Sequence, residues 1–256
     1  MSRQLSLLFL LVITITFSSW IQKPTKTFTI CIDAGHGGKD PGAMGKKTTE
    51  SKLVLAMSLE LGRIIKENLP DVKIMYTRDK DEFIPLFKRG DVANEANADL
   101  FISLHCNAST KTSITGTESY VLGLHASDKA LEVATFENNV IMKEDNYQEN
   151  YEGFDINSPE TIIMIQNLQA AYLKNSIVLA SKIEDQFVSR VGLHSRGVKQ
   201  AGFIVLWKTN MPSVLIETGF ISNPDQEAYL MSEKGQVYIC SAIYRAVRDY
   251  KQAIEK

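Results

Sequence analysis

Short apolar runs alternate along the chain with longer segments in which apolar residues recur every three or four positions. The runs are rich in β-branched residues and end at glycine or polar residues, a pattern typical of buried strands. The longer segments have the periodicity of amphipathic helices. We therefore predict strands over residues 27–33, 72–77, 100–105, 116–122, 203–206 and 214–217.

The predicted helices fill the intervals between these runs. Thr49 is a suitable N-cap for a helix that continues to residue 68, and Pro85 falls in the first turn of a helix over 85–98. Ser158 followed by proline predicts the start of a helix that continues toward residue 190. The remaining helices are predicted over 128–143, from Asn223 and from Glu233.

Strands that alternate with helices predict an α/β fold, in which a mostly parallel, twisted central sheet is covered by helices on both faces. The chain has 256 residues, of which 44% are hydrophobic, and this is enough for one sizeable core. We expect a single domain over residues 26–254, with two small domains as the alternative. The net charge of −2 gives no indication of a nucleic-acid partner or a polybasic membrane contact.

Residues 1–20 have the pattern of an export signal. Arg3 precedes an apolar stretch over residues 5–17, which is too short to span a bilayer, and Ser18 and Ser19 follow it. No cysteine for lipid attachment lies at this junction. We expect an exported protein, most simply periplasmic, with a secreted or membrane-anchored protein as the alternative.

The chain has three cysteines, Cys31, Cys106 and Cys240. This is few for a secreted domain stabilised by disulfides, and they lack the paired spacing of a zinc site. Cys31 and Cys106 lie on or beside predicted strands, so a bridge between them is one interpretation. The other, which we favour, is that they are small buried core residues.

Four residues with candidate chemistry lie at the ends of predicted elements. His36, His105 and Glu217 each follow or close an apolar run, and Glu50 opens a helix. Sites of open parallel sheets collect beyond the carboxyl ends of the strands, where these side chains are expected. Two imidazoles and a carboxylate from separate elements can hold a catalytic zinc with one position open, and a further carboxylate can activate water. The pattern indicates a hydrolase.

Each of these residues also has a structural interpretation when it is taken alone. His36 could be a loop histidine bonded to Asp33 or Asp40, and Glu50 a first-turn carboxylate favoured by the helix dipole. Under the metal hypothesis, Asp33 is the predicted outer acceptor that fixes the tautomer of His36. Arg78 and Arg89 are candidates for binding substrate carboxylates or, equally, for surface ion pairs. We assign His125 and His194 to surface or structural roles.

Taken together and in order, these residues resemble a known family, the zinc-dependent N-acetylmuramoyl-L-alanine amidases. The motifs are IDAGHGGKDPG at 32–42, then Glu50, FISLHCNA at 101–108 and PSVLIETGFISN at 212–223. The resemblance covers about residues 27–250. It implies one zinc ion per chain bound by His36, Glu50 and His105, with Glu217 as the catalytic carboxylate. The implied reaction is hydrolysis of the amide between N-acetylmuramic acid and the L-alanine of the stem peptide in peptidoglycan.

Residues 125–157 form an insertion that the minimal scaffold does not need. Members of this family that act in cell separation have an inserted helix here, which covers the zinc until an activator protein displaces it. The segment offers four carboxylates that could take the open metal position: Glu132, Glu137, Glu144 and Asp145. We expect either such a lid, whose deletion would raise basal activity, or a surface excursion or groove wall.

Two other functions remain open from the sequence. A zinc carboxypeptidase acting on stem peptides would use similar ligands and a similar base, although the run after Glu217 favours the amidase. A wall-binding protein without activity would not need all three ligands and Glu217. We expect a monomer that acts on peptidoglycan.

Overall fold

The computed structural model of the chain describes residues 27–124, 127–151 and 159–255. The predicted export signal, His125 and Ser158 lie outside these ranges. No helix within them has the length and apolar character needed to cross a membrane.

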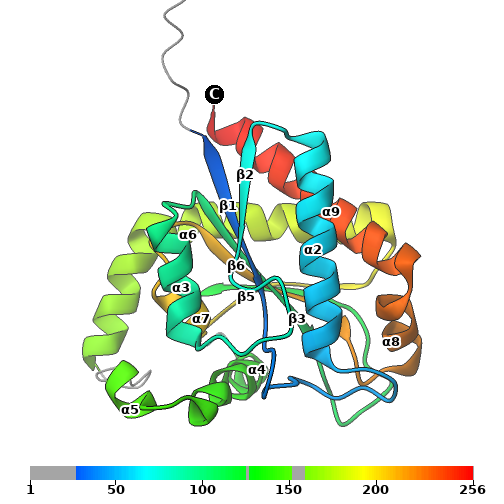
Figure 1. Cartoon of the computed structure of the whole chain (residues 1–256), viewed down its shortest axis with the longest axis horizontal. Helices are drawn as coiled ribbons and strands as arrows, with labels where there is room; N and C mark the ends of the chain where they lie inside the picture. Colours follow the sequence, from blue (N-terminus) through cyan, green and yellow to red (C-terminus); the bar gives the residue numbers. More distant parts are fainter. Residues whose placement is uncertain (1–26, 125–126, 152–158, 256) are drawn as a thin grey trace, which may run out of the picture.

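One sheet of six strands forms the centre of the described part of the chain (Figure 1). The strands lie in the order β2-β1-β3-β6-β4-β5, and every neighbouring pair is parallel except β4 and β6. The predicted mostly parallel sheet is thus confirmed. The strands are β1 (Phe28–Ala34), β2 (Val72–Tyr76), β3 (Leu100–Asn107), β4 (Thr117–Leu122), β5 (Ser195–Ala201) and β6 (Ser213–Phe220).

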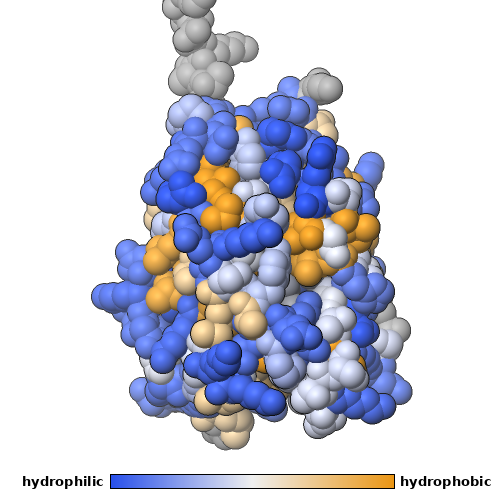
Figure 2. All heavy atoms as spheres, turned by 90° about the vertical axis from the view of Figure 1, so that its right-hand side faces the viewer, coloured by the Kyte–Doolittle hydropathy of each residue, from blue (hydrophilic) through white to orange (hydrophobic). Residues whose placement is uncertain are grey.

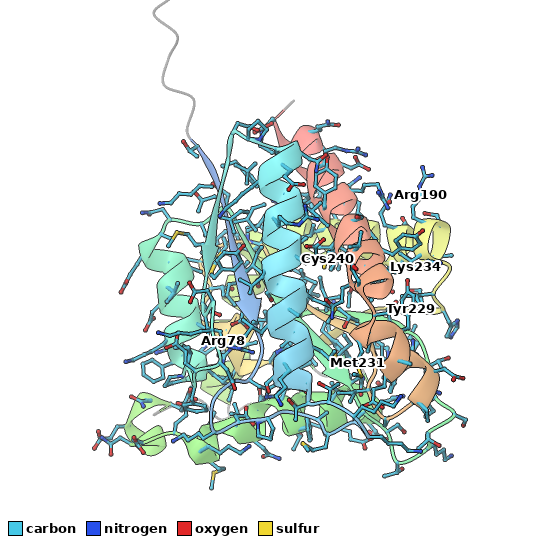
Figure 3. All side chains as sticks on the ribbon, turned by 45° about the vertical axis from the view of Figure 1, so that its right-hand side comes forward. Arg78, Arg190, Tyr229, Met231, Lys234 and Cys240 are labelled. Atoms are coloured by element: carbon cyan, nitrogen blue, oxygen red, sulfur yellow. The ribbon has the colours of Figure 1, made fainter. Side chains whose placement is uncertain are left out.

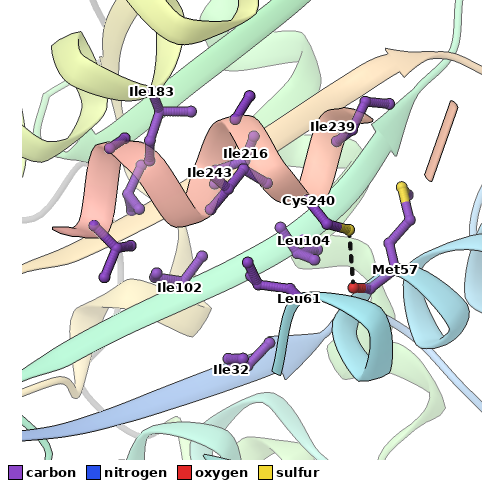
Figure 4. Packing of buried hydrophobic residues seen from close by; sticks show 14 of the residues in the cluster. Ile32, Met57, Leu61, Ile102, Leu104, Ile183, Ile216, Ile239, Cys240 and Ile243 are labelled. Atoms are coloured by element: carbon purple, nitrogen blue, oxygen red, sulfur yellow. Dashed lines mark hydrogen bonds between the residues drawn. The ribbon is translucent and has the colours of Figure 1, made fainter. Parts of the chain in front are cut away.

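Three long helices cover one face of the sheet: α2 (Glu50–Asn68), α6 (Pro159–Gln186) and α9 (Glu233–Ile254). Between them and the strands lies a largely apolar core, in which Ile102 and Ile216 of the sheet meet Leu61 and Ile243 of the helices (Figure 4). The thiol of Cys240 lies in this core and donates to the carbonyl of Met57 (Figure 4). The side of the molecule on which α8 (Pro224–Met231) and α9 lie is mostly hydrophilic, with separate hydrophobic spots, as expected for a solvated surface (Figure 2).

Shorter elements cover the opposite face: α3 (Leu86–Glu95), α4 (Asp128–Asn138) and α7 (Ile204–Trp207) (Figure 1). Their core contains Phe101, Tyr120, Phe203 and Leu215. The predicted helix over 128–143 continues from α4 as the 3₁₀ turn η1 (Asn139–Lys143), and α5 (Tyr147–Asn150) follows. The helix predicted to end near residue 190 ends in the π-helical turn η2 (Phe187–Val191). Helices on both faces and a single domain are confirmed.

Two predictions near the end of the sheet were wrong. Residues 203–206 were predicted as a strand, but they belong to the turn before α7 and to α7 itself, because a short buried apolar run is equally compatible with one turn of helix. Strand β5 was missed. It is an edge strand that pairs only with β4, and its sequence SRGVKQA has few apolar residues because most of its side chains are only partly buried.

None of the three cysteines forms a disulfide, and all are buried. Cys31 belongs to the core under α3 and α4, whereas Cys106 belongs to the core under α2 and α9. The two side chains lie on opposite faces of the sheet. The interpretation as core residues is therefore confirmed, and the bridge is excluded.

Candidate metal centre

Strand alternation brings polar residues of β1, β3 and β6 to one face of the sheet, at the carboxyl end of these strands. Apolar Ile32, Leu104 and Ile216 point to the α2 side, so the next residues, Asp33, His105 and Glu217, point to the α4 side. The register of the parallel strands places Asp33 beside Ser103 and His105 beside Glu217. These side chains therefore converge at the carboxyl ends of β1, β3 and β6.

The loop after β1 places His36 at the same carboxyl end of the sheet. His36 has the positive φ of 58° that is rare for residues other than glycine, and this backbone conformation turns its ring back toward the sheet. Its Nδ1 lies 2.7 Å from Oδ2 of Asp40, so its Nε2 faces the cluster. The predicted outer acceptor was Asp33, and this was wrong. Asp40 lies four residues further along the same loop and binds the ring, whereas the carboxylate of Asp33 is held by Arg89, Thr77 and Ser103.

Four buried side chains meet in this place: His36, Glu50, His105 and Glu137. One donor atom from each lies within 4.8 Å of all the others. Nε2 of His36 is 3.1 Å from Oε2 of Glu50, and Nδ1 of His105 is 3.0 Å from Oε1 of Glu50. Oε2 of Glu137 lies 3.1 Å from His36 and 3.0 Å from His105. The structure thus brings together all three predicted ligands and one of the four carboxylates of the insertion.

The arrangement fits a metal ion. His36 Nε2 and Glu137 Oε2 are buried and make no hydrogen bond of good geometry within the described residues, although each has close polar neighbours. Polar atoms that converge without hydrogen bonding are expected where a cation would be shared between them. Two imidazole nitrogens with carboxylate oxygens form a donor set suited to a divalent transition metal.

At two positions the site needs a glycine, because the candidate ligands occupy the space that a Cβ atom would take. A Cβ atom on Gly35 would lie 2.5 Å from the ring of His105, and one on Gly42 would lie 2.5 Å from both Glu50 Oε2 and the His36 ring. Gly42 also has a positive φ of 66°. The glycine-rich motif is therefore a consequence of close packing against the ligands.

Burial and the neighbouring carboxylates shift the pKa values of the two imidazoles in opposite directions. Burial alone would lower the pKa of His36, but the charges of Glu50 and Glu137 outweigh it, so the pKa is raised well above its ordinary value. For His105 burial is likewise outweighed, chiefly by Glu137, and the pKa rises to about 10. Metal binding here must therefore displace protons, which makes the affinity of the site dependent on pH.

Glu217 is fully buried beside this cluster, and neither of its carboxylate oxygens has a hydrogen-bond partner among the described residues. Burial raises its pKa well above the usual range, and the nearby charge of Glu137 raises it further. A carboxyl group with a raised pKa and no structural bonds is suited to taking up and returning a proton.

Arg78 and Arg89 are buried and support the loop that carries His36. Both roles proposed for them from the sequence, binding of substrate carboxylates and surface ion pairs, were therefore wrong. Arg78 lies between the end of β1 and the start of α2 (Figure 3), where it donates to the carbonyls of Ala34 and Gly35. Arg89 donates to the carbonyl of His36 at 2.8 Å and pairs with Asp33 at 2.9 Å. The two guanidinium groups thus fix three consecutive carbonyls that precede or belong to the ligand.

Asp33 belongs to this support. It accepts from the hydroxyls of Thr77 and Ser103, both at 2.6 Å, as well as from Arg89. Burial alone would raise the pKa of Asp33, but the charge of Arg89 and these two hydrogen bonds outweigh it and lower the pKa.

The other carboxylates of the insertion lie elsewhere. Glu132 and Asp145 are exposed. Glu144 accepts from the backbone N–H of Leu86 at 2.8 Å and from the hydroxyl of Tyr151, so it caps the first turn of α3. Only Glu137 reaches the cluster. His194 is exposed, in agreement with its predicted surface role.

One contact of the insertion had no clear signal in the sequence. Lys143 lies in η1 and donates to Oδ1 of Asp40 at 2.6 Å, while Oδ2 of the same carboxylate binds His36. The insertion therefore contributes Glu137 to the candidate metal site and contacts His36 indirectly, through Lys143 and Asp40.

Comparisons with known proteins agree with this geometry. Residues 30–249 match the family described as N-acetylmuramoyl-L-alanine amidase. The chain is 31% identical over 225 residues to the N-acetylmuramoyl-L-alanine amidase AmiA of Escherichia coli, covering 86% of this chain and 75% of the relative. It is also 31% identical to YqiI of Bacillus subtilis, an uncharacterized protein, over 94% of this chain and 93% of that one.

Among solved structures, the crystal structure of an N-acetylmuramoyl-L-alanine amidase from Clostridium difficile 630 superimposes with a TM-score of 0.67 at 25% identity. It covers 90% of this chain and 99% of that chain. The chain therefore belongs to the N-acetylmuramoyl-L-alanine amidase family and is a hydrolase. This membership decides against the carboxypeptidase and the inactive wall-binding protein.

Proposed function

We propose that this amidase depends on zinc and that His36, Glu50 and His105 hold one zinc ion per chain. Two atoms that bind one zinc at about 2.0–2.1 Å in tetrahedral geometry lie roughly 3.3 Å apart. The contacts of 3.0 and 3.1 Å from Glu50 to His105 and to His36 are close to this value. This convergence of three buried donors from three separate elements is the observation that carries the proposal.

Each residue of the site has a separate role in the proposed reaction. When bound, zinc supplies a Lewis acid that polarises the scissile amide and acidifies the attacking water. Glu217 accepts the proton of that water and returns it to the departing nitrogen of L-alanine. Asp40 holds His36 in the tautomer that presents Nε2 to the metal. Attack by water is direct, so the reaction needs no serine or cysteine nucleophile.

We propose further that α4 is a lid and that Glu137 occupies the position that substrate must take. Its Oε2 lies as close to the two imidazoles as the oxygens of Glu50 do. A second contact, from Lys143 to Asp40, also attaches the lid to the site. An activator protein that moves α4 away from the sheet would open the site.

The substrate is peptidoglycan, and the reaction serves remodelling of the wall or separation of daughter cells. Export through the signal at residues 1–20 would bring the enzyme to its substrate. We place it in the periplasm, with secretion or retention by an uncleaved N-terminal anchor as the alternatives.

Mass spectrometry of purified peptidoglycan tests the reaction. Protein that lacks residues 1–21 should release stem peptides beginning at L-alanine, and both a chelator and the Glu217→Gln substitution should abolish the release. Peptides trimmed only within the stem would contradict the proposed cleavage site. Release that persists in the chelator, with metal removal verified by elemental analysis, would contradict the role of zinc.

The lid is tested by Glu137→Ala, with Thr135→Ala as the control on the same helix. We expect the rate of stem-peptide release to rise in Glu137→Ala and to stay unchanged in Thr135→Ala, whose side chain is exposed and does not line the cleft beside α4. A point substitution is preferable to deletion of 126–157, because the deletion would also remove Glu144 and Tyr151 from the start of α3. Equal rates in all three proteins would contradict the lid.

A further inference from the structure

The side chain of Asn107 lies on the wall of a cleft that leads to the metal cluster. The cleft runs between residues 107–109, at and just after the end of β3, and helix α4, and Glu137 is one of the residues that line it. Asn107 comes two positions after His105, where strand alternation places its side chain on the same face of the sheet. It is one step along the strand from a proposed ligand, about 6.7 Å between Cα atoms.

The orientation of the Asn107 amide is fixed by a buried carboxylate behind it. Nδ2 of Asn107 donates to Oε2 of Glu118 at 3.3 Å. Glu118 is fully buried, forms an ion pair of 2.9 Å with Lys199 and accepts from the hydroxyl of Tyr120. A carboxylate held by a lysine can only accept hydrogen bonds, so the NH₂ group of the amide must face it.

The amide oxygen is consequently left for another partner. With Nδ2 on Glu118, Oδ1 of Asn107 turns away from the carboxylate, and none of the hydrogen bonds found among the described residues ends on it. Reversal of the amide would place two acceptors 3.3 Å apart, which is unfavourable in a buried setting. The cleft therefore contains an acceptor of fixed position next to the proposed zinc site.

We propose that Asn107 is a substrate-contacting residue, whose Oδ1 accepts a hydrogen bond from the peptide N–H of the residue that follows L-alanine. The proposal rests on the proposed function, because it places the scissile bond at the zinc site. From a scissile carbonyl at that site, an extended peptide reaches its next N–H within one to two residues, or about 3.5–7 Å. This span matches the step from His105 to Asn107. Glu118 and Lys199 are positioning residues that act through Asn107.

The test compares two synthetic substrates, an N-acetylmuramoyl tetrapeptide and its analogue methylated at the nitrogen of the second stem residue. Both are assayed with the Glu137→Ala protein, and with the same protein carrying Asn107→Ala. We expect Asn107→Ala to lower kcat/KM about tenfold on the normal substrate, as for loss of one hydrogen bond in a desolvated site. On the methylated analogue, the two proteins should be equal within about twofold, since the donor is already absent.

Two further variants separate a contact with substrate from a structural effect. Thr110→Ala changes an exposed residue of the same loop that does not line the cleft, so its kcat/KM should not change. Glu118→Gln can both donate and accept, so it no longer fixes the amide of Asn107, and we expect a loss of about threefold on the normal substrate only. This variant also tests the proposal should Asn107→Ala fail to fold.

Every result of these assays either supports or overturns the contact between Asn107 and the substrate. Equal kcat/KM of the parent and Asn107→Ala on the normal substrate would overturn the proposal. So would an equal loss on both substrates, or a change in zinc content or melting temperature that explains the loss, because each indicates a structural role. Failure of the proposed function is distinguishable, since the parent would then release no stem peptide from either substrate.

Discussion

The two faces of the central sheet are built by the same strands, yet they differ at the carboxyl end. Under α2, α6 and α9, strands β1, β3 and β6 stay apolar to that end, as at Ile32, Leu104 and Ile216. On the opposite face, under α3 and α4, the residues at the carboxyl ends of the same strands are polar: Asp33, His105 and Glu217. Neighbouring positions of one strand therefore serve different purposes, stability on one face and chemistry on the other. Substitutions of adjacent residues should separate these two properties.

The largest effect is expected for Glu217→Gln. Loss of the group that carries the proton should lower kcat about 10²–10⁴-fold. The free energy of unfolding should stay the same or rise, because a buried carboxyl group with no hydrogen-bond partner among the described residues is replaced by a neutral amide. Stem-peptide release and urea unfolding measure the two quantities. A marked loss of stability would show that Glu217 is structural instead.

Asp33→Asn tests the support beneath the chemical face. The substitution leaves the buried charge of Arg89 without its partner, so we expect the protein to lose about 3–5 kcal/mol of stability at neutral pH.

The pH dependence of the same variant follows from the lowered pKa of Asp33. Such a carboxyl group stabilises the folded protein above its unfolded pKa of about 4, and this contribution is lost as the pH falls through the lower folded value. Urea unfolding between about pH 3 and pH 7 should therefore show a decline below about pH 4 that is smaller in Asp33→Asn. Identical slopes would contradict the role of the pair.

Ile216→Ala makes the converse change on the other face. Removal of a fully buried side chain next to Glu217 should destabilise the protein by about 2–5 kcal/mol. The kcat of the folded fraction should remain within a few-fold of the parent, because the side chain points away from the metal cluster. A loss of kcat comparable to that of Glu217→Gln would show that the two faces are not separable.

The smallest of these effects is expected for Asp40→Asn. Substitution of the outer partner of a ligating histidine should lower zinc affinity about 10–100-fold. Asp145→Asn, in an exposed position of the insertion, is the control and should have no effect. Competition with a chromophoric chelator measures both. Equal affinities in the two variants would mean that Asp40 does not orient His36 toward the metal.

The sequence predicted most of the fold because its signals are strong where burial is complete. Strands β1 and β3 are continuous apolar runs, and the helix starts predicted at Asn223 and Glu233 are reproduced, with Asn223 and Ser232 as the N-caps. Strand β5 had no such signal, since an edge strand with half-buried side chains does not need an apolar run.

The candidate site could be predicted only as a set of elements, since its contacts depend on how the loops fold back. The positions of His36, Glu50, His105 and Glu217 follow from strand ends and a helix start. By contrast, the choice of Asp40 over Asp33 depends on the positive φ at His36. Likewise, only the packing of α4 against the sheet decides that Glu137, and not Glu132, reaches the imidazoles.

The assignment of the metal centre is tested by the zinc content of the purified protein together with X-ray absorption at the zinc edge. We expect one zinc per chain, with two imidazole nitrogens and carboxylate oxygen at about 2.0–2.1 Å. The zinc should be lost in His36→Ala and in Glu50→Ala, and retained in Glu217→Gln. Zinc that remains bound in His36→Ala, or a protein that binds no zinc at all, would contradict the assignment of the metal centre.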